Sequence, residues 1–142
     1  MPYPSKQEII KLFQNLEAFP EGHECFFSRT IERCSWTITG QHPFSGHWTS
    51  TQSFLQAVWW PNTNLMASPG PTFILPEGHE SVIYNDQGEA AVELRTIRTV
   101  VKQHGREYNQ HYSWHCRFNE DGLLVSVKIF LDSIHAKEVL LI

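Results

Sequence analysis

The sequence has no long apolar run, no block of basic residues and no nucleotide-binding motif. Without a run of ~18 apolar residues we expect no membrane span, and the opening MPYPSKQEII lacks the apolar segment of a signal peptide. Eleven Lys and Arg against fifteen Asp and Glu give a net charge of −4, which argues against nucleic acid as a partner, because that affinity comes largely from basic contacts to phosphates. Neither a G-x-G-x-x-G, a P-loop nor a G-x-S-x-G is present, so the sequence predicts no nucleotide cofactor and no serine nucleophile of the hydrolase type.

Cysteine is scarce and follows no pattern. The three cysteines, Cys25, Cys34 and Cys116, form no C-x-x-C and are odd in number. Such usage fits free thiols in a reducing compartment. We therefore expect a cytoplasmic protein with one domain over residues 1–142.

Aromatic residues are abundant. The chain has five Trp, nine Phe and four Tyr, many for its length. Large rings of this kind fill either a large core or an aromatic cavity that receives an apolar ligand.

The first half of the chain shows helical patterns. Ser5 and Glu8 form a capping box, and apolar residues then recur at helical spacing. A second helix is expected over 24–32, and a third begins after Thr49 or Ser50 and ends before Pro61. A short strand, CSWTITG, lies between these two helices.

The second half changes to the two-residue period of strands. Turn signals at DQG, HGRE and EDG separate the expected strands, which span 73–75, 81–85, 89–103, 108–119 and 123–132. Helices followed by an antiparallel meander predict an α+β fold with the helices on one face of the sheet. If that sheet curls, its concave face becomes a pocket.

Alternation along the last hairpin separates two faces. Phe130 and Asp132 share a face of the last strand, and His111 and His115 share a face of the strand before it. Two interpretations remain open. The polar face is solvent-exposed or a dimer interface, with Asp132 as a cap or strand-end acid, or Asp132 and His115 meet in a mostly apolar cavity, where burial raises the pKa of a carboxyl group and a histidine shares its proton.

The histidines do not predict a metal site. On a strand, His111 and His115 are ~13 Å apart, too far to chelate one ion. His42 and His47 lie in a loop without Cys or acid neighbours. We therefore predict neither a metal nor a cofactor.

Three segments resemble SnoaL-like proteins. CSWTITGQHPFSGHWTSTQSFL resembles the segment in which a Trp-bearing strand leads into a G-x-H-P-x-x-G loop and a helix. EAAVELRT resembles the central strand of that family, and GREYNQHYSWHCRFNEDGLLVSVKIFLDS resembles its closing hairpin, which ends in aromatic-x-Asp. The resemblance covers residues 8–140.

SnoaL-like proteins belong to the nuclear transport factor 2-like (NTF2-like) superfamily, with ketosteroid isomerase, scytalone dehydratase and limonene epoxide hydrolase. The resemblance implies a cone-shaped α+β fold, in which a curved antiparallel sheet packs against N-terminal helices around a deep pocket. It also implies a homodimer through the outer face of the sheet, with Asp132 as acid or base and His115 as its partner. The sequence has Phe130 where many relatives have Tyr, and Lys128 where many have Arg.

These observations predict a cofactor-independent isomerase or cyclase that acts by acid–base chemistry on a hydrophobic, polyketide- or terpenoid-derived intermediate. Asp132 and His115 are the predicted catalytic residues, and the predicted substrate-binding residues are His111, Asn109, Trp36, His42 (at the pocket mouth) and Phe130. The alternatives are a dehydratase or hydrolase on the same fold, or a non-catalytic ligand-binding or dimerisation module. An Asp132 buried in a cavity within ~3–4 Å of His115 favours an enzyme, whereas a solvated Asp132 outside the cone favours the module.

Overall fold

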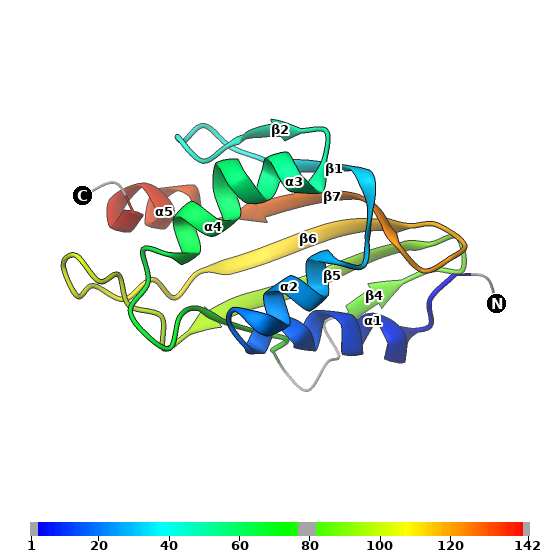
Figure 1. Cartoon of the computed structure of the whole chain (residues 1–142), viewed down its shortest axis with the longest axis horizontal. Helices are drawn as coiled ribbons and strands as arrows, with labels where there is room; N and C mark the ends of the chain where they lie inside the picture. The colour runs from blue at the N-terminus through cyan, green and yellow to red at the C-terminus, as the bar shows by residue number, and fades with distance from the viewer. Residues whose placement is uncertain (1–2, 77–81, 141–142) are drawn as a thin grey trace.

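The computed structural model describes residues 3–76 and 82–140 (Figure 1). The helices of the first half are α1 (Lys6–Gln14), η1 (Asn15–Glu17), α2 (Glu21–Phe27), α3 (Thr51–Phe54), the π-helical η2 (Leu55–Trp59) and α4 (Trp60–Thr63). The strands are β1 (Thr30–Ile38), β2 (Gly46–Trp48), β3 (Thr72–Ile74), β4 (Val82–Tyr84), β5 (Glu89–Ile97), β6 (His111–Phe118) and β7 (Leu124–Leu131), and α5 (Ser133–Leu140) follows them. None of the described helices is long and apolar enough to cross a bilayer.

The strands form one mixed sheet in the order β2-β1-β7-β6-β5-β3, with β4 paired to β5. The described pairs are antiparallel except β1 with β7, which is parallel. Figure 1 shows α1 to α4 over one face of this sheet and α5 beyond the end of β7. The predicted α+β fold, with helices on one face of a sheet, is confirmed, and the parallel pair departs from the expected antiparallel meander.

The core between helices and sheet is largely aromatic. Trp114 of β6 is fully buried at its centre. The rings around it, with centroids 5.8–6.0 Å away, are those of Phe13, Phe26, Trp36 and Trp59. Rings that bury 150–250 Å² each dominate the energetics of such a core, so the many aromatic residues of the sequence serve the core first.

The predicted helix starts are confirmed where a side-chain cap defines them. The Ser5 Oγ accepts a hydrogen bond from the Glu8 N–H (3.2 Å), and the Ser5 N–H donates to the Glu8 carboxylate (2.9 Å). Ser50, one of the two candidate caps of the third helix, accepts from the Ser53 N–H (3.1 Å). A capping side chain accepts a hydrogen bond from a backbone N–H in the first turn of the helix, which has no acceptor within the helix. Because the two residues are close in sequence, a few residues suffice to predict the cap.

Several boundaries differ from those expected. The third helical stretch runs through Pro61 to Thr63 rather than ending before Pro61, because a proline is tolerated in the first turn of α4. The second helix is Glu21–Phe27 rather than 24–32, because β1 begins at Thr30, where it pairs with Leu124 of β7. The strand expected to reach residue 103 ends at Ile97, since Arg98 has a φ of 50° and leaves the extended conformation. The short β2 and the helix α5 were not predicted at all, and residue 81 of the expected strand 81–85 lies outside the described residues.

Candidate functional site

A cavity of about 70 Å³ lies between the sheet and the helices. Its walls are mainly apolar and come from the sheet, from the α3–α4 segment and from α5; they include Phe54, Trp59, Phe73, Trp114, Ile129 and Leu131. Its polar side chains are those of Asn62, Thr63, Thr96, Thr99, Tyr108 and Tyr112. Among the described residues that line it, none is an Asp, Glu, His, Lys or Arg. Tyr108 and Tyr112 are therefore the titratable side chains on the described wall of the cavity, and their phenolic hydroxyls can donate hydrogen bonds.

One wall of the cavity is a π-helical turn. The segment Leu55–Trp59 is wound as a π-helix, and the Trp60 N–H donates to the Leu55 carbonyl, five residues back. The side chains of Asn62 and Thr63 donate to the carbonyls of Val58 and Trp59, at 2.9 Å each. Turns of this kind occur frequently at functional sites. Here the turn positions two apolar and two polar residues on the cavity wall.

A buried amide orients the polar end of the cavity. Gln110 is fully buried, and its Oε1 accepts from the N–H groups of His111 (2.9 Å) and Asp132 (3.0 Å). Its Nε2 donates to the Asp132 carbonyl (2.9 Å) and to the Tyr108 hydroxyl (3.0 Å). The Asp132 N–H needs an acceptor and the Asp132 carbonyl needs a donor. These two groups therefore determine which end of the Gln110 amide is oxygen and which is nitrogen. The Tyr108 oxygen is therefore an acceptor toward Gln110.

Tyr108 and Tyr112 form a pair of neutral hydrogen-bond donors. Burial raises the pKa of Tyr108, and it raises the pKa of Tyr112 well above its ordinary value; the two phenols also interact with each other. Both therefore stay protonated near neutral pH. Two phenols carry two protons and their mutual contact uses one. In the described part of the chain the second has no acceptor, so it is available to a ligand in the cavity.

Two of the predicted ligand-binding residues lie near the cavity but not on its wall. Trp36 is fully buried, donates from Nε1 to Thr51 Oγ1 (3.1 Å) and stacks on the cavity residue Phe54 (ring centroids 4.5 Å). His42 bonds to the Thr39 carbonyl (3.0 Å), and its ring lies 6.1 Å from that of Phe44, which lines the cavity. Trp36 thus supports a cavity wall, and the role of His42 at the mouth stays a prediction.

Four predicted site residues are exposed and do not line the cavity. His111 and His115 lie on the outer face of the sheet, the face away from the helices, because they alternate along β6 with the cavity residues. The His115 ring contacts Phe130 (centroids 4.8 Å). Asn109 is also exposed and donates to the Glu107 carboxylate (2.9 Å). None of the four lines the cavity, because the inward face of the hairpin is the aromatic one; their roles in ligand binding stay predictions.

Asp132 is exposed and caps α5. Its Oδ1 accepts from the N–H groups of Ile134 and His135, at 3.1 Å each. Since His115 pairs with Lys128, Asp132 lies about 13 Å further along the strand. The expected meeting of Asp132 and His115 in the cavity does not occur, and the alternative interpretation of Asp132 as a cap matches the structure. The catalytic roles of both residues stay predictions.

Replacing Asp132 by Asn tests its role directly. Asn caps a helix about as well as Asp, so we expect turnover within about twofold of the wild type. The Asp132→Ala variant removes the cap and should lower the free energy of unfolding by about 1 kcal/mol, measured by urea denaturation. A loss of turnover of about a hundredfold or more in Asp132→Asn, at unchanged stability, would restore the catalytic assignment.

The signal for the phenol pair was present in the sequence. Tyr108, Gln110, Tyr112 and Trp114 alternate on one face of the strand, beside the apolar face of β7. Aromatic residues on an apolar face look like core, however, and phenols at the edge of a core are easily read as packing. Among the described residues no group of three or more His, Cys, Asp or Glu is placed to hold a metal ion.

No protein-family model matches the sequence, and no curated protein matches it. Among solved structures, it resembles an NTF2-like protein from Burkholderia thailandensis, at 14% identity and a TM-score of 0.69 over 92% of this chain and 95% of that one. It also resembles the BvnE pinacolase from Penicillium brevicompactum, at 16% identity and 0.65 over 91% of this chain and 84% of that one. A protein from Catenulispora acidiphila with a ketosteroid isomerase-like fold, in complex with trimethylamine, matches at 7% identity and 0.67 over 95% of each chain. The chain therefore has the NTF2-like fold, as its sequence resemblance predicted.

Proposed function

We propose that this protein is a cofactor-independent isomerase or cyclase for an apolar, polyketide- or terpenoid-derived molecule that carries a hydrogen-bond acceptor. The observation that carries the proposal is the neutral pair Tyr108–Tyr112, which offers one unused phenolic proton at a mainly apolar, aromatic cavity. Such a site binds a carbonyl, epoxide or hydroxyl oxygen through a donor, and it binds the rest of the ligand through apolar contact.

The proposed reaction class follows from where charge develops on the substrate in the transition state. A hydrogen bond from a preoriented donor becomes stronger as negative charge grows on the substrate oxygen, and it does so most in a site that excludes water. The aromatic side chains Trp59, Phe73 and Trp114 line the cavity, and an aromatic ring stabilises positive charge that grows on carbon next to its face. A phenol that donates a hydrogen bond to the substrate oxygen, together with aromatic rings next to the substrate carbon atoms, suits a rearrangement or ring closure that needs no second reactant. A pinacolase with the same fold supports placing such an activity on it.

The cavity must widen to admit such a substrate. Its volume of about 70 Å³ is small beside the roughly 300–1,000 Å³ of ligand pockets. The partly exposed side chains on its wall include Phe44, Asn62 and Leu140, from three separate segments. Hydrogen bonds from His104 and Arg106 to the carbonyls of α5 hold the last of these segments in place. We infer that the substrate enters between these segments and displaces them.

The experiment is a conversion assay with terpenoid and polyketide ketones, epoxides and alcohols, followed by mass spectrometry and NMR. An isomerase or cyclase gives a product of unchanged mass, and the double variant Tyr108→Phe/Tyr112→Phe should not form it. A product heavier by one water would instead identify a hydrolase, and one lighter by one water a dehydratase.

The second candidate is a non-catalytic module that binds a small ligand. Two observations favour it: Asp132 is exposed and does not line the cavity, and the described lining residues include no carboxylate or imidazole, which proton transfer to carbon usually needs. The complex of a similarly folded protein with trimethylamine supports small-ligand binding on this fold. Calorimetric binding of a compound that the wild type never converts would establish this function and contradict the first.

We also propose a homodimer through the outer face of the sheet. Ile83, Tyr84 and Phe130 are 69%, 48% and 38% exposed on β4 and β7, and a groove on this face is lined by Ile83, Tyr84, His115 and Lys128. Introducing a charge at Phe130 should therefore weaken self-association. Sedimentation equilibrium should show a dimer for the wild type and a large shift toward monomer for Phe130→Glu. The matched variant Ala57→Glu, at an exposed position among the helices, should remain dimeric; equal dissociation of both would contradict this interface.

A further inference from the structure

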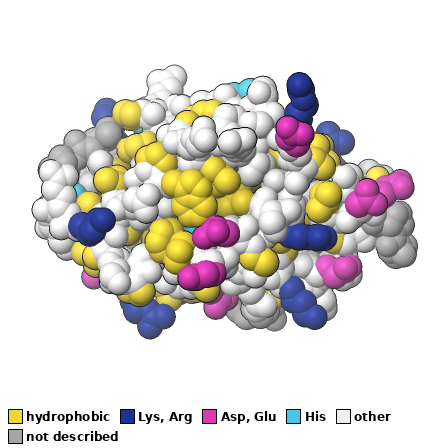
Figure 2. Space-filling view, viewed as in Figure 1, with side chains coloured by type: hydrophobic (Ala, Val, Ile, Leu, Met, Phe, Trp, Pro, Cys, Tyr) yellow, Lys and Arg dark blue, Asp and Glu magenta, His cyan; other side chains and the backbone are white. Residues whose placement is uncertain are grey.

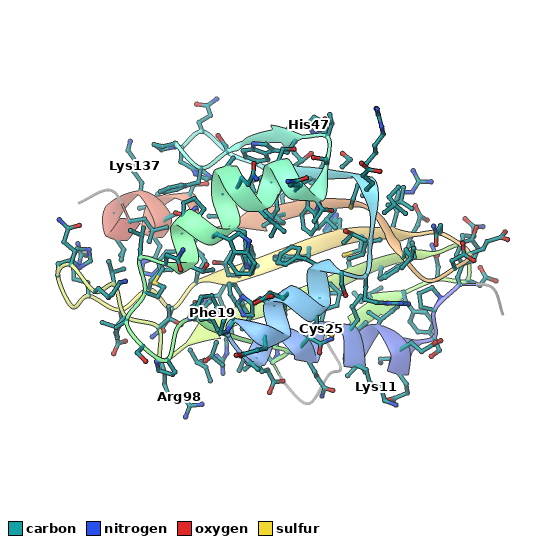
Figure 3. All side chains as sticks on the ribbon, in the orientation of Figure 1. Lys11, Phe19, Cys25, His47, Arg98 and Lys137 are labelled. Carbon is teal, nitrogen blue, oxygen red and sulfur yellow. The ribbon has the colours of Figure 1, made fainter. Side chains whose placement is uncertain are left out.

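A second hollow opens on the helix side of the molecule, apart from the cavity. This aromatic groove has a volume of about 620 Å³ and lies between α2 and the η2–α4 segment; its lining residues include Phe19, Phe27, Leu55 and Trp60. Figure 2 shows apolar side chains gathered near the middle of this side with acidic side chains next to them, and Figure 3 shows Phe19 at the start of α2. None of the residues that line the groove lines the cavity.

Three rings of the groove meet at steep angles. Phe19 and Trp60 have centroids 6.3 Å apart and planes at 59°, and Phe27 and Trp60 have centroids 6.4 Å apart and planes at 68°. Phe27 is buried, whereas Phe19 and Trp60 are partly exposed. Rings tilted in this way do not cover one another's faces as stacked rings do. Their faces carry the negative side of the ring quadrupole, which attracts a cation.

The polar groups of the groove also favour a cation. Glu24 is the charged residue among the described lining side chains, and its carboxylate has no hydrogen bond or ion pair to another described residue. Ser28 donates its proton to the Cys25 carbonyl (2.6 Å), so its oxygen can still accept. No lysine or arginine lines the groove within the described chain, and the whole chain carries a net charge of −4.

We propose that the aromatic groove binds a small alkylammonium ion of the choline or trimethylammonium class. Aromatic faces and one carboxylate are the groups that bind such ions in proteins, while a bare metal ion would need several oxygen or nitrogen ligands. The groove, with a volume of about 620 Å³, is large enough to receive such an ion. This site is independent of the proposed isomerase or cyclase activity.

The test compares choline with its neutral isostere, in which carbon replaces the nitrogen. Calorimetry or ligand-observed NMR should show choline bound about three- to thirtyfold more tightly, the range of a cation–π contribution. Added salt should weaken the binding of choline more than that of the isostere, because salt screens the exposed Glu24 charge. Equal affinities for choline and its isostere would mean that the groove binds both only through apolar contact, and this result would overturn the proposal.

Variants locate the site. Glu24→Gln, at an exposed position, should lower choline affinity by about fivefold at low salt, and Trp60→Leu should lower it by threefold or more. The matched control Glu32→Gln removes an exposed acid of β1 and should change nothing. The double variant Tyr108→Phe/Tyr112→Phe should also keep its choline affinity, since those phenols lie in the cavity. Full choline affinity in both Glu24→Gln and Trp60→Leu would contradict the proposal and would leave the proposed function untouched.

Discussion

The Tyr112→Phe variant is expected to lose about 10²- to 10³-fold in kcat, the effect of removing one preoriented donor from a developing oxyanion. The substitution removes a single hydroxyl from a phenol that the protein buries, and it leaves the ring in place against Phe73 (centroids 5.6 Å). Because the donor acts most strongly in the transition state, KM should change much less than kcat. The proposed function thus predicts a specific split between the two constants.

The measurement is steady-state kinetics on the first substrate that the conversion assay identifies. Tyr84→Phe, which removes a phenol from the exposed outer face, is the matched control and should keep wild-type values. A raised KM at unchanged kcat in Tyr112→Phe would mean that the phenol binds substrate and transition state equally. That outcome would contradict a catalytic role for the pair.

Acid is expected to destabilise the protein through His23 by about 3 kcal/mol between pH 7 and pH 4. This fully buried histidine accepts from the Trp59 indole N–H at Nδ1 (3.2 Å) and donates from Nε2 to the Leu16 carbonyl (3.1 Å). Burial lowers its pKa from 6.5 to about 4. Between these values the unfolded chain takes up a proton that the folded protein excludes. Stability is therefore complete above pH ~6.5 and is lost as the pH falls toward 4.

Urea denaturation at pH 7 and pH 4 measures this loss. His23→Gln can keep both hydrogen bonds without a titrating ring, so its free energy of unfolding should fall by about 3 kcal/mol less than that of the wild type over this range. His47→Gln, at an exposed position of β2, should behave like the wild type. The same pH dependence in the wild type and His23→Gln would contradict the assignment.

Local signals in the sequence predicted most elements of the fold. The hydrogen bonds of Ser5 and Ser50 join residues three apart in the chain, and strand alternation needs only neighbours in sequence. The parallel pairing of β1 with β7 joins residues about ninety apart, and no local pattern encodes it. The helix α5 is short and amphipathic only through Ala136 and Val139, so its periodicity is too brief to detect.

The candidate site was harder to predict than the fold. The alternation of side chains divides a strand into two faces, but it does not show which face points toward the core. The face with His111 and His115 carries groups of obvious chemistry, whereas the face with Tyr112 and Trp114 resembles packing. The direction in which the sheet curves decides between them, and that depends on contacts between distant segments. Asp132 was ambiguous for a related reason, since an acid after a strand is also an acid before a helix.

The π-helical turn at Leu55–Trp59 makes the cavity wall adjustable in evolution. A π turn holds a residue more than an α turn, so a one-residue deletion within it would restore a continuous α-helix. Because the bulge accommodates one extra residue within a single turn, the deletion would keep Asn62 and Thr63 on the cavity side of α4 and would remove only the bulge from the wall. The sheet and the phenol pair would remain unchanged. A single lost codon could then give the same donors a differently shaped chamber, and with it a different ligand.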